Sequence, residues 1–167
     1  MAQAETFIHS DDIHPIDIAE TVATHREWDF DRLAEDQIAM VVEGQWRAYS
    51  LTLAWAPRDS MLRLICTFDM DPPEDRLDPL YALLNQANDQ VWEGGFTFWR
   101  AQKLMVWRYG LLLAGEALAA PEQIDSMIGA AIENAERFYP AFQLACWGDM
   151  PADQALDIAM SRAYGRA

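Results

Sequence analysis

A hairpin rich in aromatic and aliphatic side chains occupies residues 49–68 and constrains the fold more than any other stretch of the chain. Pro57-Arg58-Asp59-Ser60 is a turn sequence, and apolar residues alternate with polar or small ones on both sides of it. With this turn at the tip, four pairs would face one another across two antiparallel strands: Trp55–Leu62, Leu53–Leu64, Leu51–Cys66 and Tyr49–Phe68. Strands with a period of two bury one face and expose the other. The hairpin therefore predicts a sheet, and it indicates no chemistry.

The chain is strongly acidic, with a net charge of −15 from 27 acidic and 12 basic residues. Nucleic acids are bound mainly through cationic contacts with phosphates, so this charge disfavours nucleic-acid binding and, for the same reason, anionic membranes. Two interpretations of the charge stay open: it keeps the protein dissolved, or it forms an acidic face that steers a basic partner. A length of 167 residues is enough for one domain with a well-packed core.

Cysteine usage and hydropathy indicate the compartment. Cys66 and Cys146 are too few for a disulfide scaffold, and Cys66 falls on the inward face of the hairpin, where a thiol behaves as a small apolar group. The N-terminal segment is polar and acidic, so we expect no signal peptide. No apolar run of about eighteen residues occurs, so we expect no membrane-spanning helix. Together these features predict a cytoplasmic protein.

Hydrophobic periodicity and turn residues divide the chain into helices and strands. A first helix opens at His14-Pro15 and ends near Glu27, with one apolar face formed by Ile16, Ala19, Val22 and Ala23. Six strands are expected at 28–34, 37–43, 46–56, 61–68, 96–101 and 104–113. The second helix covers Leu77–Val91, and its buried face should consist of Leu77, Leu80, Tyr81, Leu84, Ala87, Asn88 and Val91.

A long third helix begins at Pro121 and ends at Trp147-Gly148, and Pro140 inside it should kink or divide it, because proline removes a bond to the preceding turn. A final helix covers about 151–164. The order α-β-β-β-β-α-β-β-α-α predicts the α+β class. We expect a flexible leader over residues 1–13 and a single domain over 14–167, because no linker or repeat interrupts the chain.

Candidate sites for chemistry fail on composition or spacing. His9-Ser10-Asp11-Asp12-Ile13-His14 holds metal-ligand types, but in a loose leader without a rigid frame. The acidic run 69–78 fails the calcium-loop template, because Glu74 stands where that loop requires glycine. The three histidines precede the sheet, and no nucleophile elbow or phosphate loop accompanies them. We therefore predict no catalytic, cofactor-binding or metal-binding residues, and a protein that is not an enzyme.

The remaining signal is the outward side of the strands. If Phe96, Trp107 and their alternates face inward, a mixture of aromatic, branched and basic side chains faces outward. That mixture is typical of protein interfaces, although a helix of the same chain could also cover it. The candidate interface residues are Trp99, Val106, Arg108, Thr52 and Ile65.

Several segments, in order along the chain, resemble the YbjN family, described as bacterial sensory transduction regulators. The resemblance runs from about Pro15 to Ala159 and rests on five segments: Ile16-Asp17, Glu43-Gly44-Gln45-Trp46 with Tyr49, Cys66-Thr67-Phe68-Asp69, Trp92-x-Gly94-x-Phe96, and Ala135-Glu136-Arg137-Phe138-Tyr139-Pro140-Ala141-Phe142-Gln143 with Trp147-Gly148. It implies a fold similar to type III secretion chaperones: a bent antiparallel sheet flanked by helices, usually a homodimer. The helix over 151–164 would then be a C-terminal extension. The family supplies no catalytic residues to carry over.

Residues and resemblance together favour a non-enzymatic regulatory or chaperone-like module that binds a protein or peptide along its sheet, by edge-strand pairing and shallow apolar pockets. We expect a homodimer, no nucleic-acid partner, no membrane partner and no cofactor. The alternative is a small-molecule sensor with an apolar pocket between the sheet and the long helix. That pocket would be lined by Met105, Trp107, Phe138 and Phe142.

Overall fold

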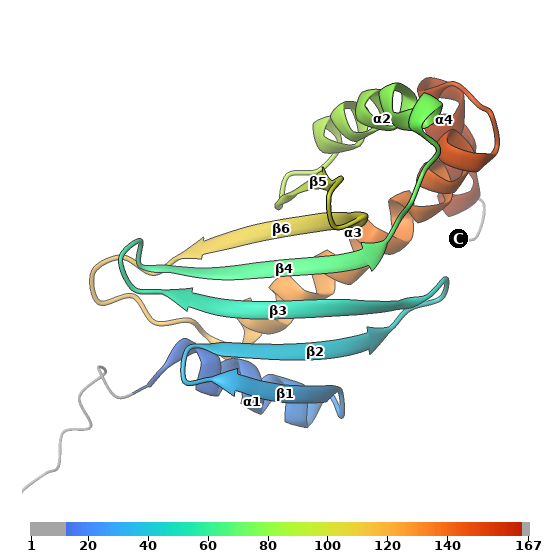
Figure 1. Ribbon diagram of the computed structural model, residues 1–167. Helices are drawn as coiled ribbons and strands as arrows, with labels where there is room; N and C mark the ends of the chain where they lie inside the picture. Colours follow the sequence, from blue (N-terminus) through green and yellow to red (C-terminus); the bar gives the residue numbers. More distant parts are fainter. Residues whose placement is uncertain (1–12, 165–167) are drawn as a thin grey trace, which may run out of the picture.

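The computed structural model describes residues 13–164, with side chains described up to Ser161. Within this range, six strands form one antiparallel sheet: β1 (Asp29–Ala34), β2 (Gln37–Glu43), β3 (Ala48–Ala56), β4 (Met61–Asp69), β5 (Gly95–Trp99) and β6 (Leu104–Leu112). The described helices are α1 (Pro15–His25), η2 (Glu74–Arg76, a 3-10 turn), α2 (Leu77–Asp89), α3 (Pro121–Trp147) and α4 (Ala152–Tyr164). The sheet order is β1-β2-β3-β4-β6-β5 (Figure 1). The α+β class and the expected order of elements are confirmed, whereas the expected leader, except for Ile13, lies outside the described residues.

The β3–β4 hairpin has the register that the sequence predicts. Its strands pair Trp55 with Leu62, Leu53 with Leu64 and Leu51 with Cys66. The rings of Tyr49 and Phe68 also meet edge to face, with centroids 5.6 Å apart. Strand β3 begins at Ala48, two residues later than expected, because the segment before it closes a turn in which the Gly44 amide donates to the Arg47 carbonyl over 2.9 Å.

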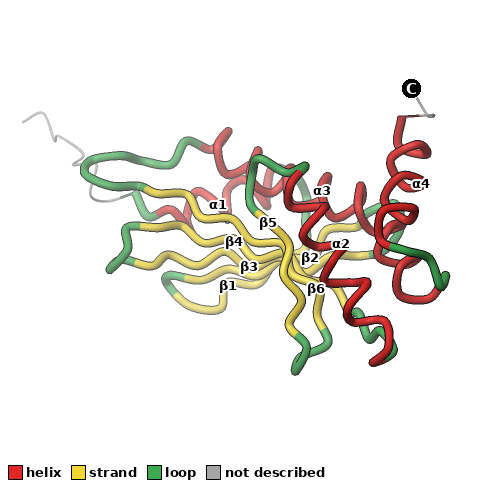
Figure 2. Tube along the Cα trace, turned by 90° about the horizontal axis from the view of Figure 1, so that it is seen from above, coloured by secondary structure: helices red, strands yellow, loops and turns green. Residues whose placement is uncertain are grey.

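Helices α1, α2 and α3 pack on the sheet, and α4 packs on α2 and α3. Helix α1 lies on β1, β2 and β3, helix α3 crosses β4 and β6, and helix α2 contacts β5. Figure 2 shows α1 and α3 on one side of the strands with α2 and α4 at one end of the sheet, and Figure 1 shows α2 and α4 together at the end near β5. The expected apolar face of α1 is confirmed, because the buried residues of that helix are Ile16, Ala19, Val22 and Ala23.

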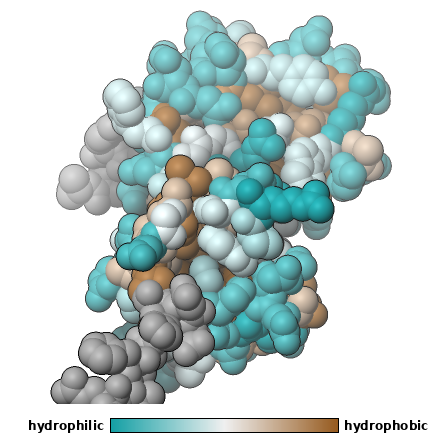
Figure 3. Space-filling view, turned by 90° about the vertical axis from the view of Figure 1, so that its left-hand side faces the viewer, coloured by the Kyte–Doolittle hydropathy of each residue, from teal (hydrophilic) through white to brown (hydrophobic). Residues whose placement is uncertain are grey.

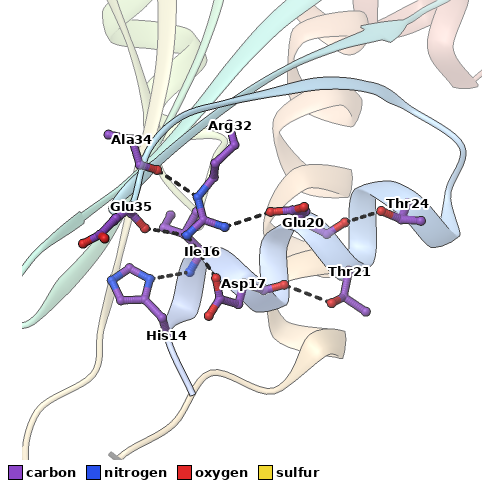
Figure 4. A network of polar contacts seen from close by, with 9 residues as sticks. All are labelled: His14, Ile16, Asp17, Glu20, Thr21, Thr24, Arg32, Ala34 and Glu35. Atoms are coloured by element: carbon purple, nitrogen blue, oxygen red, sulfur yellow. Dashed lines mark hydrogen bonds and ion pairs between the residues drawn. The ribbon is translucent and has the colours of Figure 1, made fainter. Parts of the chain in front are cut away.

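Arg32 joins the edge of the sheet to α1 (Figure 4). Its guanidinium contacts the carboxylates of Glu20 at 2.8 Å and Asp17 at 3.0 Å, and donates to the carbonyls of Ala34 and Glu35 at 2.8 and 2.6 Å. One planar fork thus satisfies both the β1–β2 turn and the acidic side of α1. This contact positions β1 as the last strand of the sheet.

Several expectations about the second helix are wrong: Asn88 is exposed, and α2 ends at Asp89, before Val91. Tyr81 in α2 is 43% exposed, and Leu83 takes its place among the buried residues. This difference arises because α2 packs against α3 and α4 as well as β5, so the side of the helix that carries Leu83 is covered. Helix α3 continues through Pro140 without being divided, and the expected kink there stays a prediction. Buried residues on both sides of the proline, Phe138 and Phe142 among them, hold both halves against the sheet.

We predict that stability falls at alkaline pH because of two buried thiols. Burial raises the pKa of Cys66 from 9.0 to about 12, and burial raises the pKa of Cys146 to about 11 although Arg76 opposes this. The unfolded thiols ionise near pH 9, whereas the folded ones stay protonated, so the unfolded state gains free energy as the pH rises. Between pH 7.5 and 9.5 we expect a loss of about 1 kcal/mol per thiol.

The measurement is urea unfolding at both pH values. The matched control is the Cys66→Ala/Cys146→Ala variant, whose absolute stability is lower but whose pH dependence should lack this loss. Equal pH dependence in both proteins would contradict the prediction.

Candidate functional site

The side of the sheet opposite the helices is not crossed by any described helix (Figures 1 and 2). We call it the outer face. It consists of the alternate strand residues that point away from the main core, among them Asp31, Ala39, Thr52, Ile65, Arg108 and Trp99. An uncovered sheet face that carries aromatic, branched and charged side chains is a candidate binding surface.

Strand register brings three of the five predicted interface residues into one row. Thr52 pairs with Ile65 across β3 and β4, and Ile65 pairs with Arg108 across β4 and β6. Residues directly opposite one another share a face with Cβ atoms about 5 Å apart. The side chains of Thr52 and Ile65 are half-buried and that of Arg108 is exposed, so all three are accessible to a partner.

A shallow hollow of about 620 Å³ opens on the outer face beside this row. Ile65, Arg108 and Trp99 line it, so a fourth predicted residue joins the same place. Gly110 of β6 also lines the hollow, and the side chain of Met61 lies so close to it that a Cβ at position 110 would collide with that side chain. The alternation in β6 already places Gly110 on the same face as Arg108, which is the signal that could have located this hollow from the sequence.

The two arginines that line the hollow differ in whether they form an ion pair within the chain. Arg63, which also lines it, forms an ion pair with Asp59. Arg108 has no ion pair or side-chain hydrogen bond within the described part of the chain, in contrast to Arg26, Arg32 and most other basic residues. An exposed guanidinium in a chain of charge −15 is a specific attractive point for a carboxylate.

Val106 requires a correction. It lies on the outer face, between Thr67 on β4 and Thr97 on β5, but its side chain is fully buried. It belongs to packing within the chain and supplies no contact area to a partner. Alternation alone sets the direction of a side chain, whereas burial depends on neighbours that the pattern does not specify.

The end of the sheet where β6 finishes continues the apolar surface. Figure 3 views the molecule from that end and shows brown, hydrophobic surface in the middle with teal, hydrophilic surface above and below it. Leu33, Leu112 and Leu118 are exposed by 57%, 60% and 47%. Register places Leu112 beside Met61, at the margin of the outer face.

One edge of the sheet is already occupied. Asn88 of α2 accepts from the amide of Phe96 at 2.6 Å and donates to the carbonyl of Phe96 at 3.0 Å, so its side-chain amide replaces a neighbouring strand at β5. Such caps protect edge strands from pairing with other chains. This contact favours the outer face over the β5 edge as a binding surface.

A second hollow, of about 360 Å³, lies between β6 and the first half of α3. Trp107 and Tyr109 form one wall, with rings stacked at 6.1 Å, and Met127 and Glu122 belong to the helix side. Of the four residues expected to line such a pocket, only Trp107 does so. Met105, Phe138 and Phe142 are fully buried in the core, because α3 packs directly on the sheet there.

Four of the five segments that carry the family resemblance meet at one junction behind the sheet, and Ile16-Asp17 is not among them. The Glu136 carboxylate accepts from the hydroxyl of Tyr49 at 2.6 Å and from the amides of Gln45 and Trp46 at 3.0 and 3.3 Å. Burial and then this carboxylate raise the pKa of Tyr49. The Trp46 ring stacks on Tyr139 at 6.4 Å. These contacts fasten the β2–β3 turn to α3, so the shared residues are structural.

The same junction includes two further resembling segments, through Phe68 and Phe96. Phe68 packs edge to face with Tyr139 at 5.5 Å, and Phe96 packs on Phe138 and Phe142 at 5.5 and 5.2 Å. Sequence reasoning did not identify Glu136 as the centre of this cluster. The available signal was the presence of one carboxylate within the apolar stripe of α3.

Groups for acid–base or metal chemistry do not converge in the described residues. His14 caps α1, where its Nδ1 accepts from the Ile16 amide at 3.2 Å, and His25 ends the same helix. Residues 9–12 of the histidine–aspartate segment lie outside the described residues. No group of three or more potential metal ligands occurs within residues 13–164. Among the described helices, none has the length and apolar content needed to cross a membrane.

Comparison with known proteins gives the family. The model of the YbjN family, described as "Putative bacterial sensory transduction regulator", matches residues 15–144. A crystal structure described as "YbjN, a putative transcription regulator from E. coli" is similar with a TM-score of 0.51 and 11% identity, over 71% of this chain and 84% of that chain. That likeness shows the fold. A search of curated proteins found no match. Helix α4 lies beyond the matched residues, which span most of the chain, from α1 almost to the end of α3. The chain belongs to the YbjN family.

Proposed function

We propose that this YbjN-family protein is a regulator that acts by binding another polypeptide on the outer face of its sheet, without catalysing a reaction. The observation that carries the proposal is the uncovered outer face, on which Thr52, Ile65 and Arg108 form one row and Trp99 closes a hollow. The family description supports a regulatory role, and the binding mode is inferred from the geometry.

A polypeptide fits this surface better than a small molecule. Five strand spacings of about 4.8 Å and strands about 30 Å long give an area of about 700 Å². This area is close to the roughly 800 Å² that each partner buries in a standard protein interface. The hollow beside Trp99 is partly open to solvent, whereas small ligands are usually enclosed on most sides. Arg108 and Ile65 supply the pairing of charge and apolar surface that protein interfaces use.

Site-specific photo-crosslinking tests this proposal. A benzophenone amino acid at Ile65 or at Trp99, introduced in living host cells, should give discrete crosslinked species in which one peptide of the partner recurs. The control position is Ala82, which is exposed on α2 on the helix side. Crosslinking at Ile65 and Trp99 no higher than at Ala82 would exclude the outer face as the binding surface.

A further inference from the structure

The second hollow, between β6 and the first half of α3, lies on the helix side of the sheet, away from the outer face. It opens where β5 is shorter than β6: Gly95 at the start of β5 pairs with Arg108, whereas β6 continues to Leu112. Beyond Arg108, β6 therefore has only β4 as a neighbour among the described strands. The second hollow has a volume of about 360 Å³, within the roughly 300–1,000 Å³ of small-molecule sites.

One wall of the second hollow contains a buried donor without an acceptor. The side chain of Trp107 is fully buried, and its Nε1 has no hydrogen-bond partner among the described residues. A Cβ at Gly94 would stand 2.8 Å from Cε2, the ring atom bonded to Nε1, so the donor lies beside the segment in which Glu93 lines the hollow. A buried donor without an acceptor is unfavourable, so an acceptor on a ligand would satisfy it. Residues 92–94 are exposed, so a small displacement of this segment admits that acceptor.

The charged groups of the second hollow are acidic. Glu93 precedes β5 and Glu122 lies in the first turn of α3, and neither forms an ion pair with a described residue. None of the described residues that line this hollow is basic. The ring of Tyr109, stacked on Trp107, adds to the attraction for a cation, because the face of an aromatic ring is negative. The same groups repel an anion.

We propose that the second hollow binds a small organic cation: a protonated amine on an apolar or aromatic body that also carries a hydroxyl group. The amine pairs with the two carboxylates, and the apolar body lies against Tyr109, Leu111 and Met127, which are half-buried or buried. A hydroxyl suits the side of Trp107, because it accepts from the indole N–H while it donates to a carboxylate such as that of Glu93. This site is separate from the outer face, so the inference does not depend on the proposed function.

Four matched compounds test the charge and the hydroxyl by isothermal titration calorimetry. Tyramine carries both groups, phenethylamine lacks the hydroxyl, 4-hydroxyphenylethanol lacks the charge, and 4-hydroxyphenylacetate carries a negative charge instead. We expect tyramine to bind, phenethylamine to bind at least about five-fold more weakly, the alcohol at least about three-fold more weakly, and the acid not to bind. No binding of tyramine at millimolar concentration, or equal binding of all four compounds, would overturn the inference.

Variants test whether tyramine occupies this hollow. Glu93→Gln and Glu122→Gln should each weaken tyramine binding about two-fold or more, whereas Glu133→Gln, at an exposed position elsewhere on α3, should leave it unchanged. Ser126→Phe places a ring in the hollow from an exposed helix position without changing its charge, and should abolish binding. Tyramine binding that persists in Ser126→Phe would place the compound elsewhere and overturn the inference.

The indole N–H of Trp107 reports the contact directly. Trp107 is the one fully buried tryptophan within residues 13–161, so its signal in a proton–nitrogen correlation spectrum should be the indole signal that exchanges most slowly with solvent. A hydrogen bond from this N–H moves its proton signal downfield. We expect that downfield shift with tyramine and not with phenethylamine, and a Trp107 signal that tyramine leaves unchanged would overturn the inference.

Discussion

Replacing Glu136 by alanine should destabilise the protein by about 3 kcal/mol, because one carboxylate accepts three hydrogen bonds that join the β2–β3 turn to α3. The largest part of this loss comes from Tyr49, whose ring is fully buried and whose hydroxyl would be left without an acceptor. The amides of Gln45 and Trp46 lie nearer the surface, where water can replace the carboxylate. Urea unfolding followed by circular dichroism measures the change.

Two further variants separate the hydroxyl from the turn. Glu136→Gln keeps one acceptor and should lose about half as much stability as the alanine variant. Tyr49→Phe removes the donor, so the double variant Tyr49→Phe/Glu136→Ala should be more stable than the sum of the two single losses predicts. A loss of less than about 1 kcal/mol in Glu136→Ala would show that the junction does not hold the turn.

The Glu136 junction also allows a test of whether the helix side of the sheet influences the proposed binding surface. It lies on the helix side of the sheet, while the proposed binding surface lies on the outer face. At temperatures where Glu136→Ala remains folded, crosslinking from Ile65 should therefore give the same species and yield as in the protein with Glu136 intact. A lower yield at those temperatures would mean that the two faces are coupled.

Local sequence patterns predicted the parts of the fold in which only one arrangement buries the apolar side chains. The turn at Pro57 fixes the β3–β4 register, and a shift by one residue would move Leu53 and Leu64 out of the core together. The buried face of α1 was also predicted, because the helical spacing of its apolar residues leaves only one apolar side. In α2, Tyr81 and Leu83 are both apolar, so the packing of α2 against α3, α4 and β5, which the periodicity of α2 cannot specify, decides which one is buried.

The sequence predicted on which face of the sheet each candidate side chain lies, but not how far that side chain is buried. Alternation placed Thr52, Ile65, Trp99 and Arg108 on one face, and the antiparallel registers brought Ile65 and Arg108 side by side. The burial of Val106 and the hollow at Gly110 depend on curvature and on neighbouring side chains, which a single strand does not encode. Pairing β4 with β6 instead of β5 also had to be known before the row from Thr52 to Arg108 could be traced.

Helix α4 lies beyond the family match, and Arg76 is the residue that fastens the start of this helix to the rest of the fold. From η2, its guanidinium donates to the Ala145 carbonyl at 2.6 and 2.9 Å and to the Met150 carbonyl at 2.9 Å, and pairs with Asp149 at 3.1 Å. Ala145 is in the last turn of α3, whose carbonyls have no partner within the helix. One cation thus satisfies the end of α3 and the connection to α4.

Replacing Arg76 by methionine, which keeps the apolar stem, should cost about 3 kcal/mol, because the Ala145 and Met150 carbonyls lose a charged donor in a half-buried place. The loss should be local. Amide hydrogen exchange in α4 should accelerate at least about ten-fold, while exchange in β3 and β4 changes only as far as global stability does. Mass spectrometry of peptides from both regions distinguishes the two.

Arg76→Lys is the matched control for this clamp. Lysine keeps the charge but cannot donate to two carbonyls from one planar group, so its α4 exchange should fall between wild type and Arg76→Met. If the exposed Asp149 ion pair were the important contact, lysine would restore protection fully and Asp149→Asn would reproduce the methionine variant. Because an ion pair at an exposed surface contributes little, we expect Asp149→Asn to leave α4 protected.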